Sequence, residues 1–411
     1  MSGRVGYAAR RIVTCDPARA TDGDALGVLV DGALIFEGNA ICWIGARAGA
    51  PSDVPLHDCG DSVITPGLVD AHTHAAWAGS RHAEYAVRMG GGDYRAIAAA
   101  GGGILSTQRA IAAASEDEIA SALFARLRRM ARLGVTSVEV KSGYGLVADE
   151  EKKQLRAIAR AHKELDLPRV VPTFLALHAL PESARSDRAA YVARVAAEVL
   201  PEVAALGLAE FVDAYVDANA FTVAEARIVG EAARALGLGV RLHVGQFADV
   251  GGAELCAELG ARSADHLEHV GDEAIASLAR SGTAAVLLPT ACFTLNQKPP
   301  PIAKLRAAGV PLVVASDANP GTAPTESLPL ALAFAVRLYG LTPTEALLAA
   351  TRTAATSLDP TDTPAHRRGI LCTGARADFV VWDLPHEQAI VQPWGTSKTR
   401  TVIHDGRTLT P

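Results

Sequence analysis

The sequence lacks the features that define several large classes of protein. No apolar run approaches the roughly 18 residues that cross a bilayer, and the first twenty residues have no apolar core of a signal peptide. A net charge of −6 over 411 residues argues against a nucleic-acid or anionic-membrane partner. The six cysteines are scattered without a CxxC pair, which indicates reduced thiols. We therefore expect a cytoplasmic protein.

Several catalytic and cofactor motifs are missing as well. There is no GxSxG nucleophile elbow, and no cysteine sits in a recognisable base-paired setting. The glycine-rich segments GGGD (90–93) and AGGGILST (100–107) lack the Lys-Ser/Thr ending of a phosphate-binding loop, so a flexible lid or a tight turn is the better interpretation. A doubly wound nucleotide-binding fold would need a glycine loop after its first strand, and none is present.

What the sequence does contain is a regular alternation of apolar β-like runs and Ala-, Glu- and Arg-rich helical stretches. Eight runs fit parallel strands: 62–74, 135–145, 169–180, 209–217, 239–247, 262–270, 284–293 and 311–321. In the helical stretch SEDEIASALFARLRRMARLG, the first residue, Ser115, is a plausible helix N-cap. Eight βα units predict an α/β fold of the (β/α)8 TIM-barrel type better than an open sheet. Both chain ends are β-rich instead, with Asp-Gly hairpin signals at 31–32 and 405–406.

Polar residues recur where the predicted strands end, which is the end at which barrel active sites lie. His72 and His74 close the first run and, at i and i+2, point to the same face. Other strand ends carry Tyr144, His178, His243 with Gln246, His266, and Asp317. Three imidazoles and one carboxylate, from His72, His74, His243 and Asp317, suit a zinc or iron ion.

A second metal is the less favoured interpretation. Lys141, on the second predicted strand, would have to act as a bridging ligand. The fourth strand offers only Asp213 and Asp217 near its end. We therefore expect one ion per chain.

Longer motifs around these residues resemble a known family. PGLVDAHTH, the histidines of the fifth and sixth strands and ASDANPGT resemble the amidohydrolase superfamily. Within it, DAHTHAAWAGSR, VEVKSGYGL, FLALHALP and SDANPGT resemble the imidazolonepropionase family over nearly the whole chain. The resemblance implies a hydrolase of histidine degradation that converts 4-imidazolone-5-propanoate and water to N-formimidoyl-L-glutamate.

The resemblance also implies an architecture and a set of site residues. The chain ends would join into a small β-sandwich domain, giving domains at 1–63 with 359–411 and at 64–358, and the family suggests a homodimer. The implied metal ligands are His72, His74, His243 and Asp317. The implied substrate contacts are Arg81, Tyr144, His178, Gln246, Asn319, Gly321 and Thr322.

The chemistry of this reaction fits those residue types. A metal that lowers the pKa of water toward 7 supplies a hydroxide to attack the ring amide carbonyl. Asp317 can accept the proton of that water and pass it to the departing ring nitrogen, while His266 donates to the developing oxyanion. Arg81 offers a bidentate fork for the propanoate carboxylate. Gln246 stands where many superfamily members have a glutamate, so it can form hydrogen bonds but cannot transfer a proton.

Two other functions compete with this one. Another cyclic amidase or a deaminase of the same superfamily would favour glutamate at position 246 and would not need Arg81. A non-catalytic barrel scaffold would be expected to lack one or more metal ligands, whereas all four are present. The ligand set accepts zinc or iron and does not distinguish them.

Overall fold

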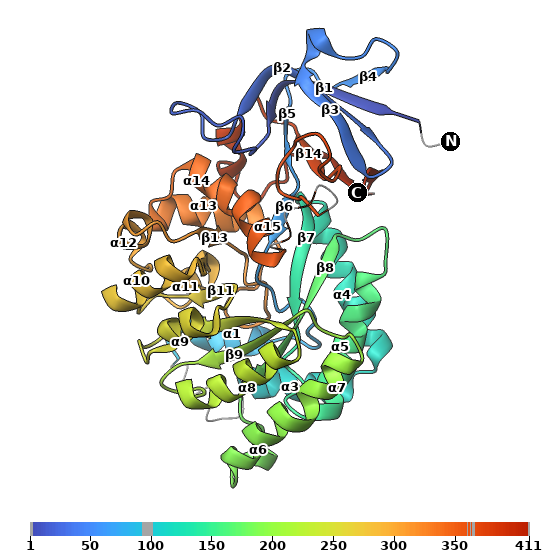
Figure 1. Cartoon of the computed structure of the whole chain (residues 1–411). Coiled ribbons are helices and arrows are strands. Elements are labelled where there is room, and N and C mark those ends of the chain that lie inside the picture. The colour runs from blue at the N-terminus through green and yellow to red at the C-terminus, as the bar shows by residue number, and fades with distance from the viewer. Residues whose placement is uncertain (1–2, 93–101, 360, 362, 364–365, 410–411) are drawn as a thin grey trace.

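The structure is a computed structural model that describes residues 3–92, 102–359, 361, 363 and 366–409. Two sheets organise the described chain, one carrying both chain ends and the other forming a barrel (Figure 1). Of the two glycine-rich segments expected to form a lid or a tight turn, residues 93, 100 and 101 lie outside the described residues, and Gly90 ends helix α1 (His82–Met89). The described part of the second glycine-rich segment begins helix α3 (Ile104–Ala113).

The barrel consists of eight parallel strands that pair in chain order within the described residues. They are β6 (Leu68–Asp70), β7 (Val135–Lys141), β8 (Arg169–Leu177), β9 (Phe211–Val216), β10 (Gly239–Val244), β11 (Ser263–His266), β12 (Ala284–Leu287) and β13 (Leu312–Val314). The segments after the first and last strands meet, since the N–H of His74 donates to Ala318 O over 3.0 Å and that of Asp317 to His72 O over 3.1 Å. The predicted (β/α)8 barrel is confirmed.

Helices cover the outside of the barrel (Figure 1). All seven residues of β7 are buried, as a strand covered on both faces requires. Ser115 caps α4 through a capping box with Glu118, as the sequence predicts. Besides α3, the helices are α1 (His82–Met89), α4 (Glu116–Ala131), α5 (Ala148–His162), α6 (Arg188–Arg194), α7 (Leu200–Ala205), α8 (Val223–Ala235), α9 (Gly252–Leu259), α10 (Asp272–Ser281), α11 (Pro289–Thr294), α12 (Ile302–Ala307), α13 (Leu328–Tyr339), α14 (Pro343–Ala349) and α15 (Arg352–Leu358). Four shorter helical segments are η1 (Arg47–Gly49), η2 (Glu182–Ala184), η3 (Val195–Val199) and η4 (Glu387–Val391).

The two chain ends join in a separate eight-stranded sheet, in which strands from both ends are hydrogen-bonded together. Its strands are β1 (Val5–Val13), β2 (Val28–Glu37), β3 (Ala40–Ala46), β4 (Leu56–Asp58), β5 (Val63–Pro66), β14 (Phe379–Trp382), β15 (Thr399–His404) and β16 (Arg407–Thr408). Phe36, Phe379 and Ile403 lie in a core of its own. The expected small β domain built from both ends is therefore present.

The run 62–74, expected as one barrel strand, is divided between the two sheets. β5 pairs with β1 and β14 in the terminal sheet, whereas β6 pairs with β7 in the barrel. Gly67 stands between them, and a Cβ there would come within 2.0 Å of Thr136 Oγ1, so only glycine permits this close approach. The domain limits at residues 63 and 358 stay a prediction.

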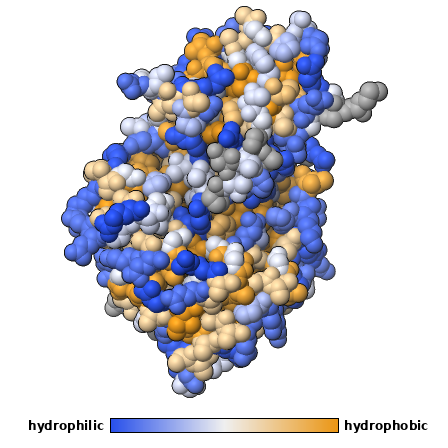
Figure 2. All heavy atoms as spheres, in the orientation of Figure 1, coloured by the Kyte–Doolittle hydropathy of each residue, from blue (hydrophilic) through white to orange (hydrophobic). Residues whose placement is uncertain are grey.

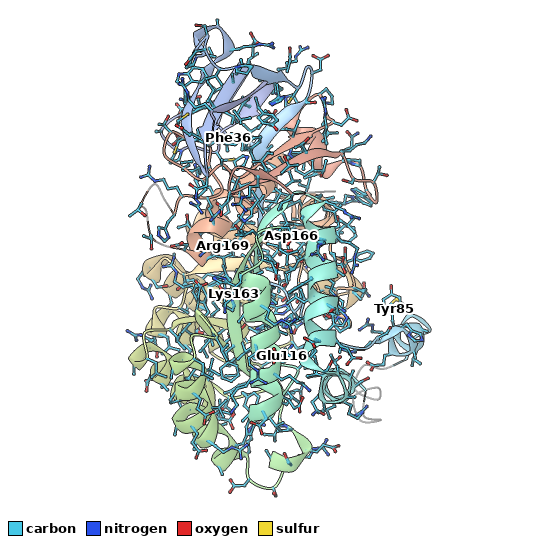
Figure 3. The ribbon with its side chains drawn as sticks, turned by 90° about the vertical axis from the view of Figure 1, so that its right-hand side faces the viewer. Phe36, Tyr85, Glu116, Lys163, Asp166 and Arg169 are labelled. Carbon is cyan, nitrogen blue, oxygen red and sulfur yellow. The ribbon has the colours of Figure 1, made fainter. Side chains whose placement is uncertain are left out.

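The orientation of the barrel decides which end is open for chemistry. Arg169, where β8 begins, lies toward the terminal sheet, and Glu116, where α4 begins, lies at the opposite end (Figure 3). The carboxyl ends of the strands therefore face away from the terminal sheet. Hydrophilic and hydrophobic residues are mixed over the face seen in Figure 2. Among the described helices, none is long and apolar enough to span a bilayer.

Candidate metal centre and substrate cavity

The four predicted metal ligands converge at the carboxyl ends of the barrel strands. The Nε2 atoms of His74 and His243 are 3.3 Å apart, and Asp317 Oδ1 lies 3.4 Å from His74 Nε2 and 3.6 Å from His72 Nε2. Ligands about 2.1 Å from an ion at tetrahedral angles lie roughly 3.4 Å from one another. The spacing of these side chains therefore fits one ion at their centre.

Two of the predicted ligands, His72 and His243, each have a carboxylate beside the Nδ1 atom of the ring. His72 Nδ1 is 2.6 Å from Asp265 Oδ2, and His243 Nδ1 is 2.9 Å from Asp213 Oδ2. An Nδ1–H facing a carboxylate leaves the Nε2 lone pair for a metal. In the described part of the chain, His72 Nε2 is buried without a hydrogen-bond partner. Burial lowers the pKa of His72, His74 and His243 well below the usual value, which keeps the imidazoles neutral as ligands must be.

Asp317 differs from an ordinary surface carboxylate in two respects. Its φ of 54° is uncommon for a residue with a side chain, and such conformations are concentrated at functional sites. Burial raises its pKa to about 7, although His266 nearby and a hydrogen bond from Asn319 oppose the rise. Without a bound cation, this carboxyl group exchanges a proton near neutral pH.

His266 lies beside the ligands without joining them. Its ring centroid is 5.5 Å from that of His243, and its φ of 85° is again in the left-handed region. Burial alone would lower its pKa, but the Glu268 carboxylate 3.7 Å from Nδ1, together with Asp317, raises the pKa above the usual value. His266 is therefore a buried proton donor.

A cavity of about 70 Å³ opens over this cluster. Most of the predicted site residues line it: His74, Arg81, Tyr144, His178, His243, Gln246, His266, Asp317, Asn319 and Thr322. Three further lining residues, which sequence reasoning missed, are Ile104, Tyr215 and Phe247. Gly321 lies at the edge of the cavity through its contact with Arg81.

Arg81 is only 7% exposed and is fixed by its own helix. Its Nε donates to Glu84 Oε2 over 3.0 Å, and Glu84 also accepts the N–H of Gly103 over 2.9 Å. The guanidinium lies against the backbone of Gly321, whose carbonyl accepts from Arg88 over 2.6 Å. These contacts hold Arg81 at the wall of the cavity.

The loop after β13 is held together by the side chain of Asn319. Its Oδ1 accepts the N–H groups of Gly321 and Thr322 at 2.8 and 2.7 Å, and its Nδ2 donates to Asp317 O at 2.7 Å. Both ends of this amide are therefore engaged within the loop. Asn319 shapes the cavity wall chiefly by fixing the turn that carries Asp317 and Gly321.

Gln246 is engaged on one side only. The Tyr215 hydroxyl donates to Gln246 Oε1 over 2.8 Å, and Gln297 Nε2 donates to the Gln246 backbone carbonyl over 2.6 Å. The Tyr215 hydroxyl thus holds the amide oxygen of Gln246, and Gln246 itself lines the cavity. The sequence reasoning did not anticipate Tyr215.

Tyr144 and His178 form the remaining wall. Their ring centroids are 5.2 Å apart, and the ring of His178 stacks on that of His74 at 5.4 Å. His178 Nδ1 is 2.7 Å from Gly143 O, and burial lowers its pKa to about 4, so the imidazole is neutral with Nδ1 as donor. Its Nε2 is then a hydrogen-bond acceptor.

A second group with metal-ligand spacing, Asp378, His404 and Asp405, lies in the terminal sheet. Arg368 forms ion pairs with both of its carboxylates, and Arg376 lies 2.8 Å from Asp405. The guanidinium groups of Arg368 and Arg376 therefore already neutralise the two carboxylates that a metal ion would need.

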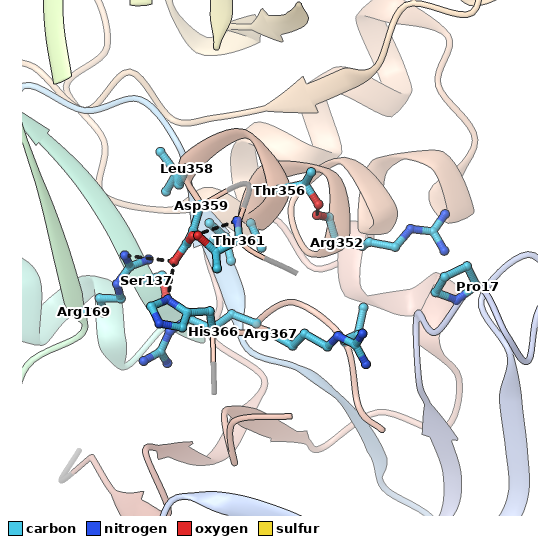
Figure 4. A pocket seen from close by; sticks show the side chains of 14 residues that line it. Pro17, Ser137, Arg169, Arg352, Thr356, Leu358, Asp359, Thr361, His366 and Arg367 are labelled. Atoms are coloured by element: carbon cyan, nitrogen blue, oxygen red, sulfur yellow. Dashed lines mark hydrogen bonds and ion pairs between the residues drawn. The ribbon is translucent and has the colours of Figure 1, made fainter. Parts of the chain in front are cut away.

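A larger cavity, of about 210 Å³, lies at the opposite end of the barrel (Figure 4). Charged side chains that line it interact with one another. Arg169 lies 3.5 Å from Asp359, and Asp359 lies 3.1 Å from His366 Nδ1. Arg352 donates to the Cys15 carbonyl over 3.1 Å. Among the described residues that line it, none belongs to the predicted site.

Comparisons with known proteins agree with this geometry. The family profile described as "Amidohydrolase family" matches residues 63–409. An imidazolonepropionase of Ralstonia nicotianae is 44% identical over 391 residues, covering 94% of this chain and 95% of the relative. One from Chromobacterium violaceum is 45% identical over 400 residues, with 96% and 95% covered.

Solved structures share the fold at much lower identity. A triazine hydrolase from Arthrobacter aurescens superimposes with a TM-score of 0.73 at 16% identity, covering 98% of this chain and 94% of that one. An adenosine deaminase from Xanthomonas campestris gives 0.69 at 20% identity, with 98% and 92% covered. At such identities, the likeness concerns the barrel and its accessory sheet alone.

Proposed function

This chain belongs to the amidohydrolase family and, within it, to the imidazolonepropionases, and from that premise we propose how its own residues open the ring of 4-imidazolone-5-propanoate. The enzyme is a hydrolase that yields N-formimidoyl-L-glutamate. The observation that carries the proposal is the convergence of His72, His74, His243 and Asp317 at the spacing of one tetrahedral ion.

One zinc or iron ion per chain would be held by these four side chains. When bound, such an ion lowers the pKa of water and polarises a carbonyl oxygen. The fit rests on the neutral imidazoles and on the buried His72 Nε2, which has no other hydrogen-bond partner among the described residues. Asp265 and Asp213 fix the ring planes of His72 and His243.

Asp317 transfers protons in this proposal, and His266 stabilises the negative charge that develops on the carbonyl oxygen. Asp317 accepts a proton from the water that adds to the ring carbonyl carbon, and delivers it to the ring nitrogen as the carbon–nitrogen bond breaks. His266, kept protonated by Glu268, donates to the carbonyl oxygen as that oxygen gains negative charge; one such contact contributes about 2.7–4 kcal/mol in acyl transfer.

The remaining residues hold the substrate by its two ends. Arg81 binds the propanoate carboxylate, and Glu84 orients the guanidinium for it. The Gln246 NH2 group and the His178 Nε2 lie on the cavity wall, where they pair with an acceptor and a donor of the imidazolone ring. Tyr144 covers the ring, and Asn319, Gly321 and Thr322 shape the wall beside Arg81.

We also propose a cytoplasmic location and a homodimeric state. All six cysteines carry free thiols, as expected of a cytoplasmic enzyme. A homodimer is proposed from the family alone. Cell fractionation and sedimentation analysis test these two statements.

The function is tested with His243→Ala and a matched control, His269→Ala, whose side chain is exposed beyond His266. Consumption of imidazolone propanoate and formation of N-formimidoyl-L-glutamate are measured together with bound metal. We expect His243→Ala to lose most metal and turnover while remaining folded, and His269→Ala to keep both. Full metal content and turnover in His243→Ala would refute the proposed site.

A further inference from the structure

Five charged side chains lie fully buried inside the barrel, directly beneath the metal ligands. They are three carboxylates and two cations: Glu139, Asp213, Asp265, Lys141 and Arg241, each with a side chain 0% exposed. Burying so many charges is costly unless each is paired, so their arrangement needs a reason. The catalytic steps described above use none of them directly.

The ammonium of Lys141 is the point at which this cluster meets the metal site. Lys141 Nζ lies 2.8 Å from Glu139 Oε1, 2.8 Å from Asp213 Oδ2 and 3.7 Å from Asp265 Oδ2. The two aspartate oxygens are the same atoms that face the ligand imidazoles, at 2.9 Å for His243 and 2.6 Å for His72. Each oxygen is thus shared between the ammonium and one imidazole.

We propose that Lys141 is a positioning residue of the metal centre, which ties together the two carboxylates that orient His243 and His72. Lys141 lies on β7, Asp213 on β9 and Asp265 on β11, which are alternate strands of the barrel. Glu139 and Thr173 support the ammonium from its other side, since Thr173 Oγ1 donates to Glu139 Oε1 over 2.6 Å. This role differs from that of a bridging ligand, because the ammonium forms ion pairs with the two aspartates and has no lone pair to offer a metal.

Arg241 provides a matched comparison inside the same cluster. It is equally buried and contacts Glu139 Oε1 at 3.2 Å. Its other guanidinium nitrogens donate to backbone carbonyls, of Ala71 over 2.9 Å and of Ser357 over 3.3 Å. Arg241 therefore stabilises the barrel without contacting either carboxylate behind a ligand, as far as the described contacts go.

The proposal rests on the metal role assigned to His72 and His243, and it is tested by metal affinity without any substrate. Metal-free wild type, Lys141→Met and Arg241→Met are titrated with Zn²⁺ against a chromophoric chelator, and the visible spectrum of the Co²⁺ form reports ligand geometry. Losing a partner behind a metal ligand weakens binding by about 10- to 100-fold. We expect that loss and an altered Co²⁺ spectrum for Lys141→Met, and less than about threefold for Arg241→Met, whose melting temperature falls instead.

Two results would overturn the proposal: Lys141→Met binding Zn²⁺ within about threefold of wild type, or Arg241→Met weakening it as much as Lys141→Met does. Turnover of imidazolone propanoate by the wild type is measured separately. A wild type that binds Zn²⁺ without hydrolysing this substrate would refute the proposed function and leave the role of Lys141 intact.

A charge-balanced pair covers the case in which Lys141→Met alone does not fold. Adding Lys141→Met to Asp213→Asn removes one charge of each sign from the cluster, so its net charge is that of the wild type. Since Lys141 acts partly through Asp213, its removal in the Asp213→Asn background should weaken Zn²⁺ binding less than its removal from the wild type does, because only its contact with Asp265 is then lost. An equal loss in both backgrounds would contradict the coupling to Asp213.

Discussion

The guanidinium of Arg81 rests on the backbone of Gly321, so closely that a Cβ on Gly321 would come within 2.3 Å of Arg81 Nη1 and 2.7 Å of Cζ. The absence of a side chain at position 321 thus sets where the arginine stands. Space for Arg81 is therefore one physical reason for a glycine at this position.

Gly321→Ala should therefore displace Arg81 and weaken recognition of the propanoate carboxylate. A hydrogen bond to a charged group is worth about 1.5–3 kcal/mol, which corresponds to a loss of about 10- to 150-fold in kcat/KM. Gly23→Ala is the control, because nothing lies within 4 Å of a Cβ there. Steady-state kinetics with unchanged metal content would support this account, and wild-type kcat/KM in Gly321→Ala would rule it out.

Removing the arginine itself separates substrate recognition from support of the fold. Arg81→Met should lower kcat/KM for the propanoate substrate by about 30- to 5,000-fold, since losing one partner of a buried charged pair costs about 2–5 kcal/mol. An imidazolone without the carboxylate should be a poor substrate of the wild type and should lose little more in the variant. Equal losses on both substrates would mean that Arg81 supports the metal loop instead.

The hydroxyl of Tyr215 should influence the reaction through Gln246. Tyr215→Phe removes the hydroxyl that fixes Gln246 Oε1, and a neutral hydrogen bond is worth about 0.5–1.5 kcal/mol, so kcat/KM should fall about two- to tenfold. Tyr7→Phe, in the terminal sheet, serves as the control. Adding Tyr215→Phe to the Gln246→Ala variant should leave kcat/KM unchanged. A kcat/KM in the double variant that falls by both single losses would contradict the coupling.

Metal binding should depend on pH through one proton. In the metal-free protein, Asp317 has a pKa of about 7 and must lose its proton to act as a ligand, whereas burial keeps the three imidazoles neutral at that pH. Affinity for Zn²⁺ should be constant above pH 7 and fall about tenfold per pH unit below it. Calorimetry in two buffers of different ionisation enthalpy counts the protons released. A slope of three protons would show that the histidines titrate there as well.

The sequence predicts the barrel and its ligands because both leave local signals. His72 and His74 stand two residues apart after an apolar run, and His243 and Asp317 end their own strands in the same way. Parallel strands of a barrel then bring these ends together. The expectation of one strand over 62–74 overlooks the dipeptide Pro66-Gly67, which marks a break, because the residues on both sides of it are equally apolar.

The residues that sequence reasoning missed act on other residues. In the sequence, Tyr215 has the appearance of an ordinary aromatic residue of a strand. Only the structure shows that its hydroxyl donates to Gln246 Oε1. Asp213, Asp265 and Lys141 do carry a signal, since charged residues of opposite sign interrupt buried strands. Which of them pair depends on strand order and register, and those are properties of the closed barrel.

The central claim is that one ion, held by His72, His74, His243 and Asp317, makes this chain an imidazolonepropionase. The most direct test is to titrate metal-free protein with Zn²⁺ or Fe²⁺ while turnover of 4-imidazolone-5-propanoate is measured. We predict negligible turnover without metal and a linear rise that ends sharply at one ion per chain. Turnover by the metal-free protein, or a rise that ends only at two ions, would contradict the account.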